Sequence, residues 1–343
     1  MISRHGRTSS PPIRKRTDLY AALGLSALLA VGVGPCPAQT AGWKPARPIE
    51  IIVGVSPGGG IDRTARTLQK IMQDKRYIEV ATTVINKPGG GGAIAQSYLN
   101  QHPGDAHYVY LTATSLLTNH ITGKSTLSHK DITPLAMLSD EYIGLAVNTE
   151  SPLKSGKDLL EALKTRPESV PVGIATAIGN TNHIAAALVA KATGGDVKKM
   201  RVAVFSSGGE AMTAAIGGHV GLVATPAANL VAHMQAGRLR VLGIAAPQRL
   251  SGVLAAVPTL REQGIPAIVA NWRPMIGPKG LNAAQTAFWE DAFAKLTRTA
   301  EWRNEVETGG SINHYMDSRE LAAYFDAQYA AFKSILGDLG LAK

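Results

Sequence analysis

Cysteine is almost absent from this chain of 343 residues, in which Cys36 is the only one. Because Cys36 lies close to the N-terminus, the long remainder can form no disulfide of its own and must be held together by its core. With 45% hydrophobic and 17% charged residues, the chain has the composition for a sizeable core. It is also long enough for two domains of ordinary size.

Aromatic residues and basic tracts are scarce as well. Aromatic side chains make up 5% of the chain, and no run of lysines and arginines follows the N-terminal region. Nucleic-acid binders use such runs for phosphates and aromatic platforms for bases, so no nucleic acid is expected as a partner. The nine histidines show no H-E-x-x-H spacing, and no glycine run completes a nucleotide-binding motif. We therefore expect neither a metal nor a cofactor.

Residues 1–38 differ from the rest of the chain. A basic region that ends at Arg16 is followed by an apolar run from Leu19 to Val33, which is short for a membrane span, and Ala38 offers a small residue for cleavage. This pattern predicts a secretory signal peptide cleaved near Ala38 and a periplasmic protein. An uncleaved anchor is the alternative, as is lipid attachment at Cys36, where the preceding proline is unfavourable. Without residues 1–38, which hold five basic residues and one acidic residue, the net charge is a mild +6.

Short β-branched runs alternate with helical patterns through most of the chain. Residues 49–55 have the pattern of a buried strand, and Ile61, Ala65, Leu68 and Met72 follow at helical spacing. This alternation predicts an α/β protein with parallel strands. Further strands are predicted at 79–85, from 107, and at 143–147, 171–175, 201–205, 220–224 and 238–246. Further helices are predicted at 93–99, 183–192, 210–216 and 228–237.

From Asn271 onward the pattern is typical of helices. Two apolar faces stand out in this region, and core packing explains their aromatic residues better than a cofactor site does. One face is formed by Trp289, Phe293 and Leu296, the other by Leu321, Phe325, Phe332 and Leu336.

The segment from Gly54 to Gly58 matches G-x-S-x-G, the motif around the nucleophile of many hydrolases. In that motif the backbone N–H after the serine stabilises an oxyanion. Here Pro57 follows Ser56 and has no N–H, and proline also favours extended geometry at the residue before it. The motif therefore does not indicate a serine nucleophile.

Two glycine runs, at 58–60 and 89–92, follow predicted strands and precede predicted helices. Glycines at such junctions allow backbone N–H groups to point at an anion, and a helix N-terminus favours negative charge. A tight turn without a ligand is the alternative for either run, and their repetition favours binding. Asp62 either caps the first helical turn or lies near the ligand, where a carboxylate would need a bridging water or a donor group on the ligand.

The ordered set of motifs resembles the substrate-binding proteins of tripartite tricarboxylate transporters, also called Bordetella uptake gene (Bug) receptors. Eight segments carry the resemblance: 57–66 (PGGGIDRTAR), 86–92 (NKPGGGG), 103–111 (PGDAHYVYL), 179–183 (GNTNH), 216–220 (IGGHV), 236–244 (AGRLRVLGI), 257–264 (VPTLREQG) and 272–278 (WRPMIGP).

The resemblance implies a fold and a domain organisation. It implies a type II periplasmic-binding-protein fold with two α/β domains hinged around a cleft. The first domain would comprise residues 40–145 and 270–343, and the second residues 146–269. A monomer is expected.

The resemblance also implies where a ligand binds, although three positions depart from the family pattern. The usual Y-K-G is Phe205-Ser206-Ser207 here, a common Asp is Thr225, and an Asn-like residue is Ala93. Arg273 is either a counter-charge for the ligand or a surface residue. The candidate ligand-binding residues are Ser56, Gly58, Gly59, Gly60, Asp62, Gly90, Gly91, Gly92, Thr114, Ser115, Gly179, Asn180, Thr181, His183, Ser206, Ser207 and Thr225.

The expected function is capture of a small organic acid, without catalysis, for transient delivery to membrane transporter subunits. One alternative is a periplasmic receptor that presents its ligand to a sensor kinase. The other is a periplasmic hydrolase that uses Ser56 or Ser151. Which carboxylate binds does not follow from the sequence, since backbone groups recognise a carboxylate without reading the rest of the molecule.

Overall fold

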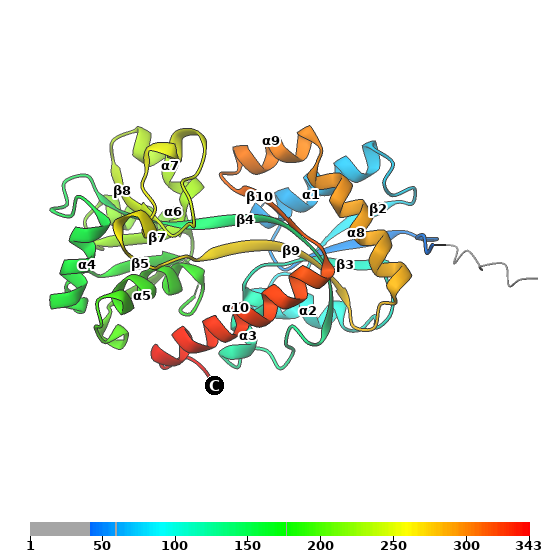
Figure 1. Ribbon diagram of the computed structural model, residues 1–343, viewed down its shortest axis with the longest axis horizontal. Coiled ribbons are helices and arrows are strands. Elements are labelled where there is room, and N and C mark those ends of the chain that lie inside the picture. The colour runs from blue at the N-terminus through cyan, green and yellow to red at the C-terminus, as the bar shows by residue number, and fades with distance from the viewer. Residues whose placement is uncertain (1–41, 59, 176) are drawn as a thin grey trace, which may run out of the picture. The chain divides into compact units, whose positions relative to one another are not determined.

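The structure is a computed structural model that describes residues 42–58, 60–175 and 177–343 (Figure 1). The expected signal peptide and Cys36 lie outside these ranges. The strands are β1 (Ile49–Val53), β2 (Thr82–Asn86), β3 (Tyr108–Leu111), β4 (Ile132–Asn148), β5 (Val172–Ala175), β6 (Val202–Phe205), β7 (Leu222–Pro226), β8 (Leu239–Ile244), β9 (Ala270–Pro278) and β10 (Ile312–Met316). The helices are α1 (Gly60–Asp74), α2 (Ala93–Leu99), α3 (Ser115–Ile121), α4 (Gly156–Thr165), α5 (Thr181–Ala192), α6 (Gly208–Ile216), α7 (Ala227–Gln235), α8 (Ala283–Thr297), α9 (Ala300–Thr308) and α10 (Ser318–Asp338).

Parallel strands form both ends of the sheet, as the alternating pattern predicts. At one end β1 pairs in parallel with β2 and β3, and at the other β5 pairs in parallel with β6 and β7. Each of these strands leads through a short connection into a helix. The carboxyl ends of neighbouring parallel strands meet at one edge of a sheet, so the residues that follow them are brought together.

Two long strands connect the two ends of the sheet. β4 and β9 pair antiparallel from Ile132–Pro278 to Tyr142–Ala270 (Figure 1). β4 continues to pair with β7 and β8, while β9 also pairs with β3, and β10 joins the outside of β4. Of the 17 residues of β4, only 143–147 were predicted as strand.

The prediction that the chain becomes helical from Asn271 is wrong. Residues 271–278 belong to β9, and β10 separates α9 from α10. β9 is buried from Trp272 to Pro278 because it lies between β3 and β4. A strand with such neighbours shows no polar-apolar alternation, so its sequence lacks the usual signal of period two.

The aromatic residues of the last third are core residues, as predicted. Trp289 and Phe293 of α8 stack at 5.2 Å between ring centroids and are fully buried with Trp302 of α9. Phe325 of α10 packs against Trp272 of β9. The contact of Phe325 with Trp272 fixes α10 to β9.

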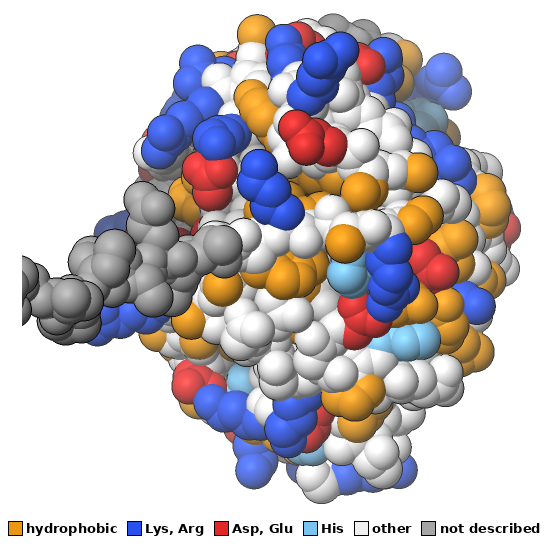
Figure 2. All heavy atoms as spheres, turned by 90° about the vertical axis from the view of Figure 1, so that its right-hand side faces the viewer, with side chains coloured by type: hydrophobic (Ala, Val, Ile, Leu, Met, Phe, Trp, Pro, Cys, Tyr) orange, Lys and Arg blue, Asp and Glu red, His pale blue; other side chains and the backbone are white. Residues whose placement is uncertain are grey.

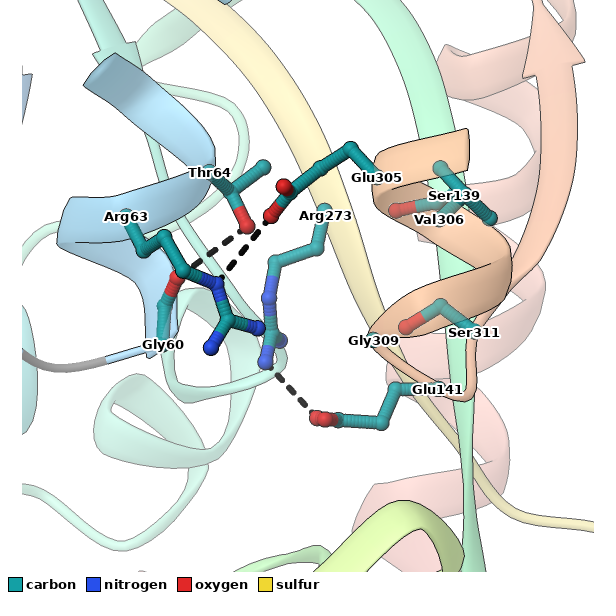
Figure 3. A pocket seen from close by; sticks show the side chains of 10 residues that line it. All are labelled: Gly60, Arg63, Thr64, Ser139, Glu141, Arg273, Glu305, Val306, Gly309 and Ser311. Carbon is teal, nitrogen blue, oxygen red and sulfur yellow. Dashed lines mark hydrogen bonds and ion pairs between the residues drawn. The ribbon is translucent and has the colours of Figure 1, made fainter. Parts of the chain in front are cut away.

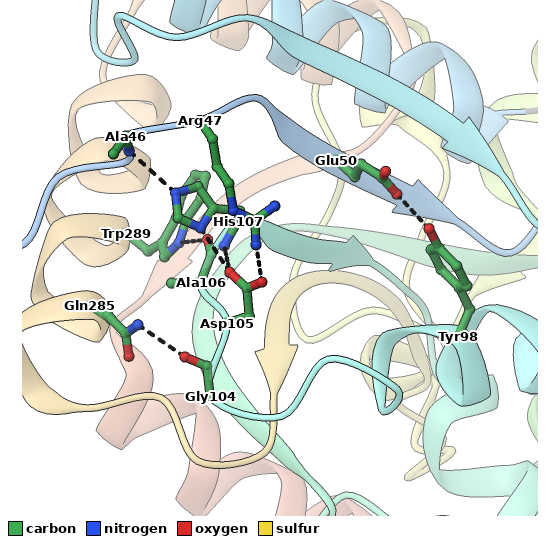
Figure 4. A network of polar contacts seen from close by, with 10 residues as sticks. All are labelled: Ala46, Arg47, Glu50, Tyr98, Gly104, Asp105, Ala106, His107, Gln285 and Trp289. Carbon is green, nitrogen blue, oxygen red and sulfur yellow. Dashed lines mark hydrogen bonds and ion pairs between the residues drawn. The ribbon is translucent and has the colours of Figure 1, made fainter.

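The start of the described chain is tied down by polar contacts (Figure 4). The backbone N–H of Ala46 donates to His107 Nε2 at 3.3 Å, and Arg47 pairs with Asp105. Asp105 also contacts His107 Nδ1 at 2.7 Å, and Trp289 Nε1 donates to the Ala106 carbonyl at 3.0 Å. Residues 46 and 47 are thereby held to the loop before β3 and, through it, to α8.

Figure 2 shows the face at the right-hand side of Figure 1, where lysine and arginine side chains mix with acidic and apolar ones. Opposite charges that lie close together partly cancel each other's electric field. Within the described ranges, no helix combines the length and the apolar character needed to cross a membrane.

Candidate functional site

A cavity of about 300 Å³ lies where the ends of several strands meet. Its walls come from the segment before α3, the ends of β5 and β7, the first turns of α5, α6 and α7, and the start of β9. The described residues that line it are Ala113, Thr114, Ser115, Thr118, Ala175, Asn180, Thr181, Asn182, Gly208, Thr225, Pro226, Asn229 and Asn271.

No residue in this set carries a charge, and most carry a hydroxyl or an amide. The N-termini of α5, α6 and α7 all contribute residues to the wall. Asn180 caps α5 and Ser207 caps α6 with their side chains, whereas Pro226, the residue before α7, makes no side-chain cap. Helix N-termini carry partial positive charge, so the cavity is suited to an anion held by neutral donors.

Five of the predicted ligand-binding residues are brought together in this cavity. Thr114 and Ser115 lie on one side, and Asn180, Thr181 and Thr225 on the other. Thr114, Thr181 and Thr225 are each at most 6% exposed. Thr114 and Ser115 follow the end of β3, Asn180 and Thr181 follow the end of β5, and Thr225 lies near the end of β7.

The first glycine loop is arranged differently from the expected anion cradle. The N–H of Gly58 donates to Asp62 Oδ2 at 2.9 Å, so it is not available to a ligand. Ser56 is exposed and does not line the cavity. No hydrogen bond joins Ser56 to a histidine in the part of the chain that the structure describes, so a hydrolase site gains no support there. Gly59 lies outside the described residues.

Asp62 is buried and holds this loop together. Besides Gly58, it accepts hydrogen bonds from Arg66 Nε at 3.0 Å and from Asn86 Nδ2 at 2.8 Å. These bonds, led by the one from Arg66, lower the pKa of Asp62 to about 2. Asp62 therefore neither caps the helix in the simple way expected nor points to the cavity, because its carboxylate is already occupied.

The second glycine loop borders the cavity without lining it. Gly89, Gly90, Gly91 and Gly92 all have positive φ, and the Asn119 amide donates to the carbonyls of Gly90 and Gly91. A Cβ at Gly92 would lie 2.6 Å from the Tyr110 hydroxyl oxygen and 3.6 Å from Ser115 Oγ. Gly92 is thus a close neighbour of a lining residue.

The remaining predicted residues support the cavity wall from outside it. His183 Nδ1 accepts a hydrogen bond from the Gly179 N–H at 3.1 Å, and burial lowers the pKa of His183 to about 4. Ser207 Oγ accepts from the N–H of Glu210, and the Ser206 N–H donates to the Glu210 carboxylate. These groups hold the first turns of α5 and α6 in place. None of the predicted ones lines the cavity, although the sequence predicts that they contact the ligand.

A second, smaller cavity of about 30 Å³ is charged (Figure 3). Arg273 pairs with Glu141 at 2.7 Å and Arg63 with Glu305 at 3.2 Å, beside Gly60 at the start of α1. Arg273 is only 9% exposed, so it is not a surface arginine. Its guanidinium already forms an ion pair with Glu141, so Arg273 is not a free positive charge that could pair with the ligand.

A larger groove of about 620 Å³ lies beside α7 and the end of α9. None of the predicted residues lines it. Gly310 and Ala228 both line this groove and lie close together, because a Cβ on Gly310 would be 2.5 Å from Ala228 Cβ. Because no strand ends or capped helix starts converge there, the cavity of 300 Å³ is the better candidate site.

The family model of the tripartite tricarboxylate transporter family receptor matches residues 64–341. The chain belongs to this family. Protein BugT of Bordetella pertussis is 30% identical over 269 residues, which is 77% of this chain and 79% of BugT. A TctC solute-binding protein from Polaromonas, solved without ligand, has a TM-score of 0.74 and 27% identity, over 86% of this chain and 99% of that one.

Two solved structures from Rhodopseudomonas palustris share the fold of this receptor. MatC with bound malate has a TM-score of 0.68 at 21% identity, over 85% of this chain and 99% of its own. A second protein, with adipate, has a TM-score of 0.73 at 20% identity, over 87% and 99%. The expectation of an α/β fold like that of periplasmic binding proteins is confirmed.

Eight lining residues of this receptor were not predicted. Four of them, Ala113, Asn182, Gly208 and Pro226, adjoin predicted positions, and a wider reading of the same segments would have found them. Asn271 is different, because its segment was read as helical. The eight are Ala113, Thr118, Ala175, Asn182, Gly208, Pro226, Asn229 and Asn271.

Proposed function

We propose that this receptor captures a small organic acid in the cavity of about 300 Å³ and delivers it, without a reaction, to the membrane subunits of a tripartite tricarboxylate-type transporter. One observation carries the choice of an acid. The described lining is built from neutral donors at three helix N-termini and contains no carboxylate that would repel an anion. Malate and adipate, the molecules in two structures of the same fold, are both carboxylates.

The ligand is held mainly by Thr114, Ser115, Asn180, Thr181 and Thr225, partly through water. A carboxylate at a helix N-terminus gains about 0.3–1 kcal/mol when exposed and up to about 2 kcal/mol when partly buried. Several such termini can therefore replace a formal positive charge. Gly92 of the second glycine loop adjoins this site beside Ser115.

We further propose that residues 40–145 with 270–343 and residues 146–269 move as two domains about β4 and β9. These two strands are long and pass between the two ends of the sheet. Thr114 and Ser115 belong to the first of these parts, and Thr181 and Thr225 to the second. Closure around a ligand would bring both sets of hydroxyls onto it.

In this proposal the protein works in the periplasm as a monomer, after export and cleavage near Ala38. The mild positive charge of the chain without residues 1–38 favours small anions. Secretion with N-terminal sequencing of the exported chain tests the cleavage site.

Isothermal titration of the chain from Gln39 onward with malate, adipate and citrate tests the main proposal. We expect saturable binding of at least one acid and none of the corresponding amide, because the amide lacks the negative charge. The variant Ser97→Ala, an exposed position on α2, is the control for handling and folding. If no carboxylate binds while a serine-directed probe labels Ser56, the protein is not an organic-acid receptor.

A further inference from the structure

A row of hydrogen bonds runs from the charged pair of Arg273 and Glu141 to the cavity of about 300 Å³. Arg273 Nη2 donates to Glu141 Oε2 at 2.7 Å, and Asn271 Nδ2 donates to the same oxygen at 2.9 Å. Thr114 Oγ1 then lies 3.1 Å from Asn271 Oδ1. Glu141 and Asn271 are register partners in the pairing of β4 with β9.

The chemistry of these groups sets the direction of every bond in the row. A carboxylate that faces a guanidinium only accepts hydrogen bonds, so the NH₂ of Asn271 must face Glu141. The amide oxygen of Asn271 must then face Thr114, and it has no hydrogen to give. The single hydroxyl hydrogen of Thr114 is therefore committed to Asn271.

Because its hydrogen is used in this way, Thr114 Oγ1 can only accept a hydrogen bond from a group in the cavity. Thr114 is 4% exposed and lines the cavity, so water does not freely compensate for a wrong partner. A carboxylate or carbonyl oxygen at this position would meet another acceptor, whereas a hydrogen-bond donor would be bound. A site that offers a buried acceptor discriminates against a ligand that lacks the matching donor.

We infer that Thr114 is a specificity-determining residue that selects a hydroxy acid, with the ligand's hydroxyl donating to Thr114 Oγ1. The inference rests on the proposed capture of an organic acid. An ammonium group is also a donor, but no described lining residue is a carboxylate, and Glu141 already faces Arg273 and Asn271. A hydroxyl needs no such charge, so it fits the position better than an ammonium group.

Titration with matched pairs of acids tests this inference. Malate and succinate differ by one hydroxyl, as do citrate and propane-1,2,3-tricarboxylate. For the pair that binds, the unaltered protein should prefer the hydroxy acid by roughly tenfold or more, since a buried acceptor is otherwise left unpaired. In Thr114→Val the preference should fall to about twofold or less, because no acceptor remains.

Two control variants test whether the effect of Thr114→Val comes from a general change in folding. Thr114→Ser keeps the hydroxyl and should keep the preference, which shows that the effect is not one of folding. Ser97→Ala, at an exposed position on α2 outside the cavity, should also keep it.

The outcomes separate the two proposals. Equal binding of hydroxy and deoxy acids overturns the role of Thr114 and leaves the capture of organic acids intact. Tighter binding of aspartate than of malate overturns the preference for a hydroxyl over an ammonium group. Failure of every acid to bind contradicts the proposed function itself.

Discussion

The carboxylate of Asp62 accepts the backbone N–H of Gly58 at 2.9 Å and thereby closes the first glycine loop on itself. The same side chain binds Arg66 and Asn86, so α1, β2 and the loop share one buried anion. The anion at this loop is thus a side chain of the protein itself, and the primary role of the loop is structural.

The variant Asp62→Asn should destabilise the fold by about 2–3 kcal/mol, because an amide cannot accept from all three partners and leaves buried donors unpaired. Chemical denaturation at neutral pH measures the loss. Asp74→Asn is the control, since Asp74 pairs with Lys70 where both side chains are exposed, and it should change stability by less than about 0.5 kcal/mol. Equal effects of the two changes would contradict the role assigned to Asp62.

Acid should also weaken the loop. The pKa of Asp62 is lowered from 3.8 to about 2, so its stabilising contribution is present above pH 4 and is lost as the pH falls to 2. The loss amounts to roughly 2 kcal/mol. Comparing the difference in unfolding free energy between the unaltered protein and Asp62→Asn at pH 5 and pH 2.5 tests the sign: the difference should shrink at the lower pH.

Gly54→Ala should destabilise the protein strongly. Its Cβ would lie 2.6 Å from the Tyr110 hydroxyl oxygen and 2.8 Å from the Cα of Gly92, so the backbone of the second loop would have to move. A loss of about 2–3 kcal/mol is expected for such overpacking. Gly58→Ala, at φ +85° with open space around it, should lose only about 1 kcal/mol. Thermal unfolding of both variants gives the comparison, and the reverse order would be inconsistent with this packing.

His183 makes the stability of the fold depend on pH in a higher pH range than Asp62 does. It is buried as the neutral acceptor of the Gly179 N–H, and its pKa is lowered to about 4. Between pH 6.5 and 4 the unfolded chain takes up the proton first, so stability falls as the pH falls, by up to roughly 3 kcal/mol. His183→Gln should remove this part of the pH profile and exposed His219→Gln should not, as followed by unfolding free energies across the range. An unchanged profile in His183→Gln would rule out this explanation.

Thr181→Asp should lower the affinity for organic acids by about tenfold or more. Thr181 is 6% exposed in the cavity wall, so the new carboxylate would face the ligand's carboxylate with little water between them. Thr181→Asn, which is neutral and of similar size, should lose less. Titration with the acid that binds the unaltered protein measures both, and equal losses would mean that charge at this wall is unimportant.

Local patterns in the sequence were enough to place much of the fold. The resemblance to the receptor family indicated Thr114, Ser115, Asn180, Thr181 and Thr225, and the structure brings them together because the ends of parallel strands meet at one edge. The same patterns could not show that the Gly58 N–H is taken by Asp62, or that Ser207 serves as a helix cap. Such hydrogen bonds depend on side-chain directions within a loop.

The amino-acid sequence alone establishes the family, the α/β alternation and the neutral, hydroxyl-rich character of the cavity wall. That β9 is a strand follows from packing in three dimensions, because its buried apolar run takes its conformation from β3 and β4 on either side. The direction of the Thr114 hydroxyl was decided in the same way. It depends on Asn271, Glu141 and Arg273, which lie 27 to 159 positions away in the chain and become neighbours when β4 pairs with β9.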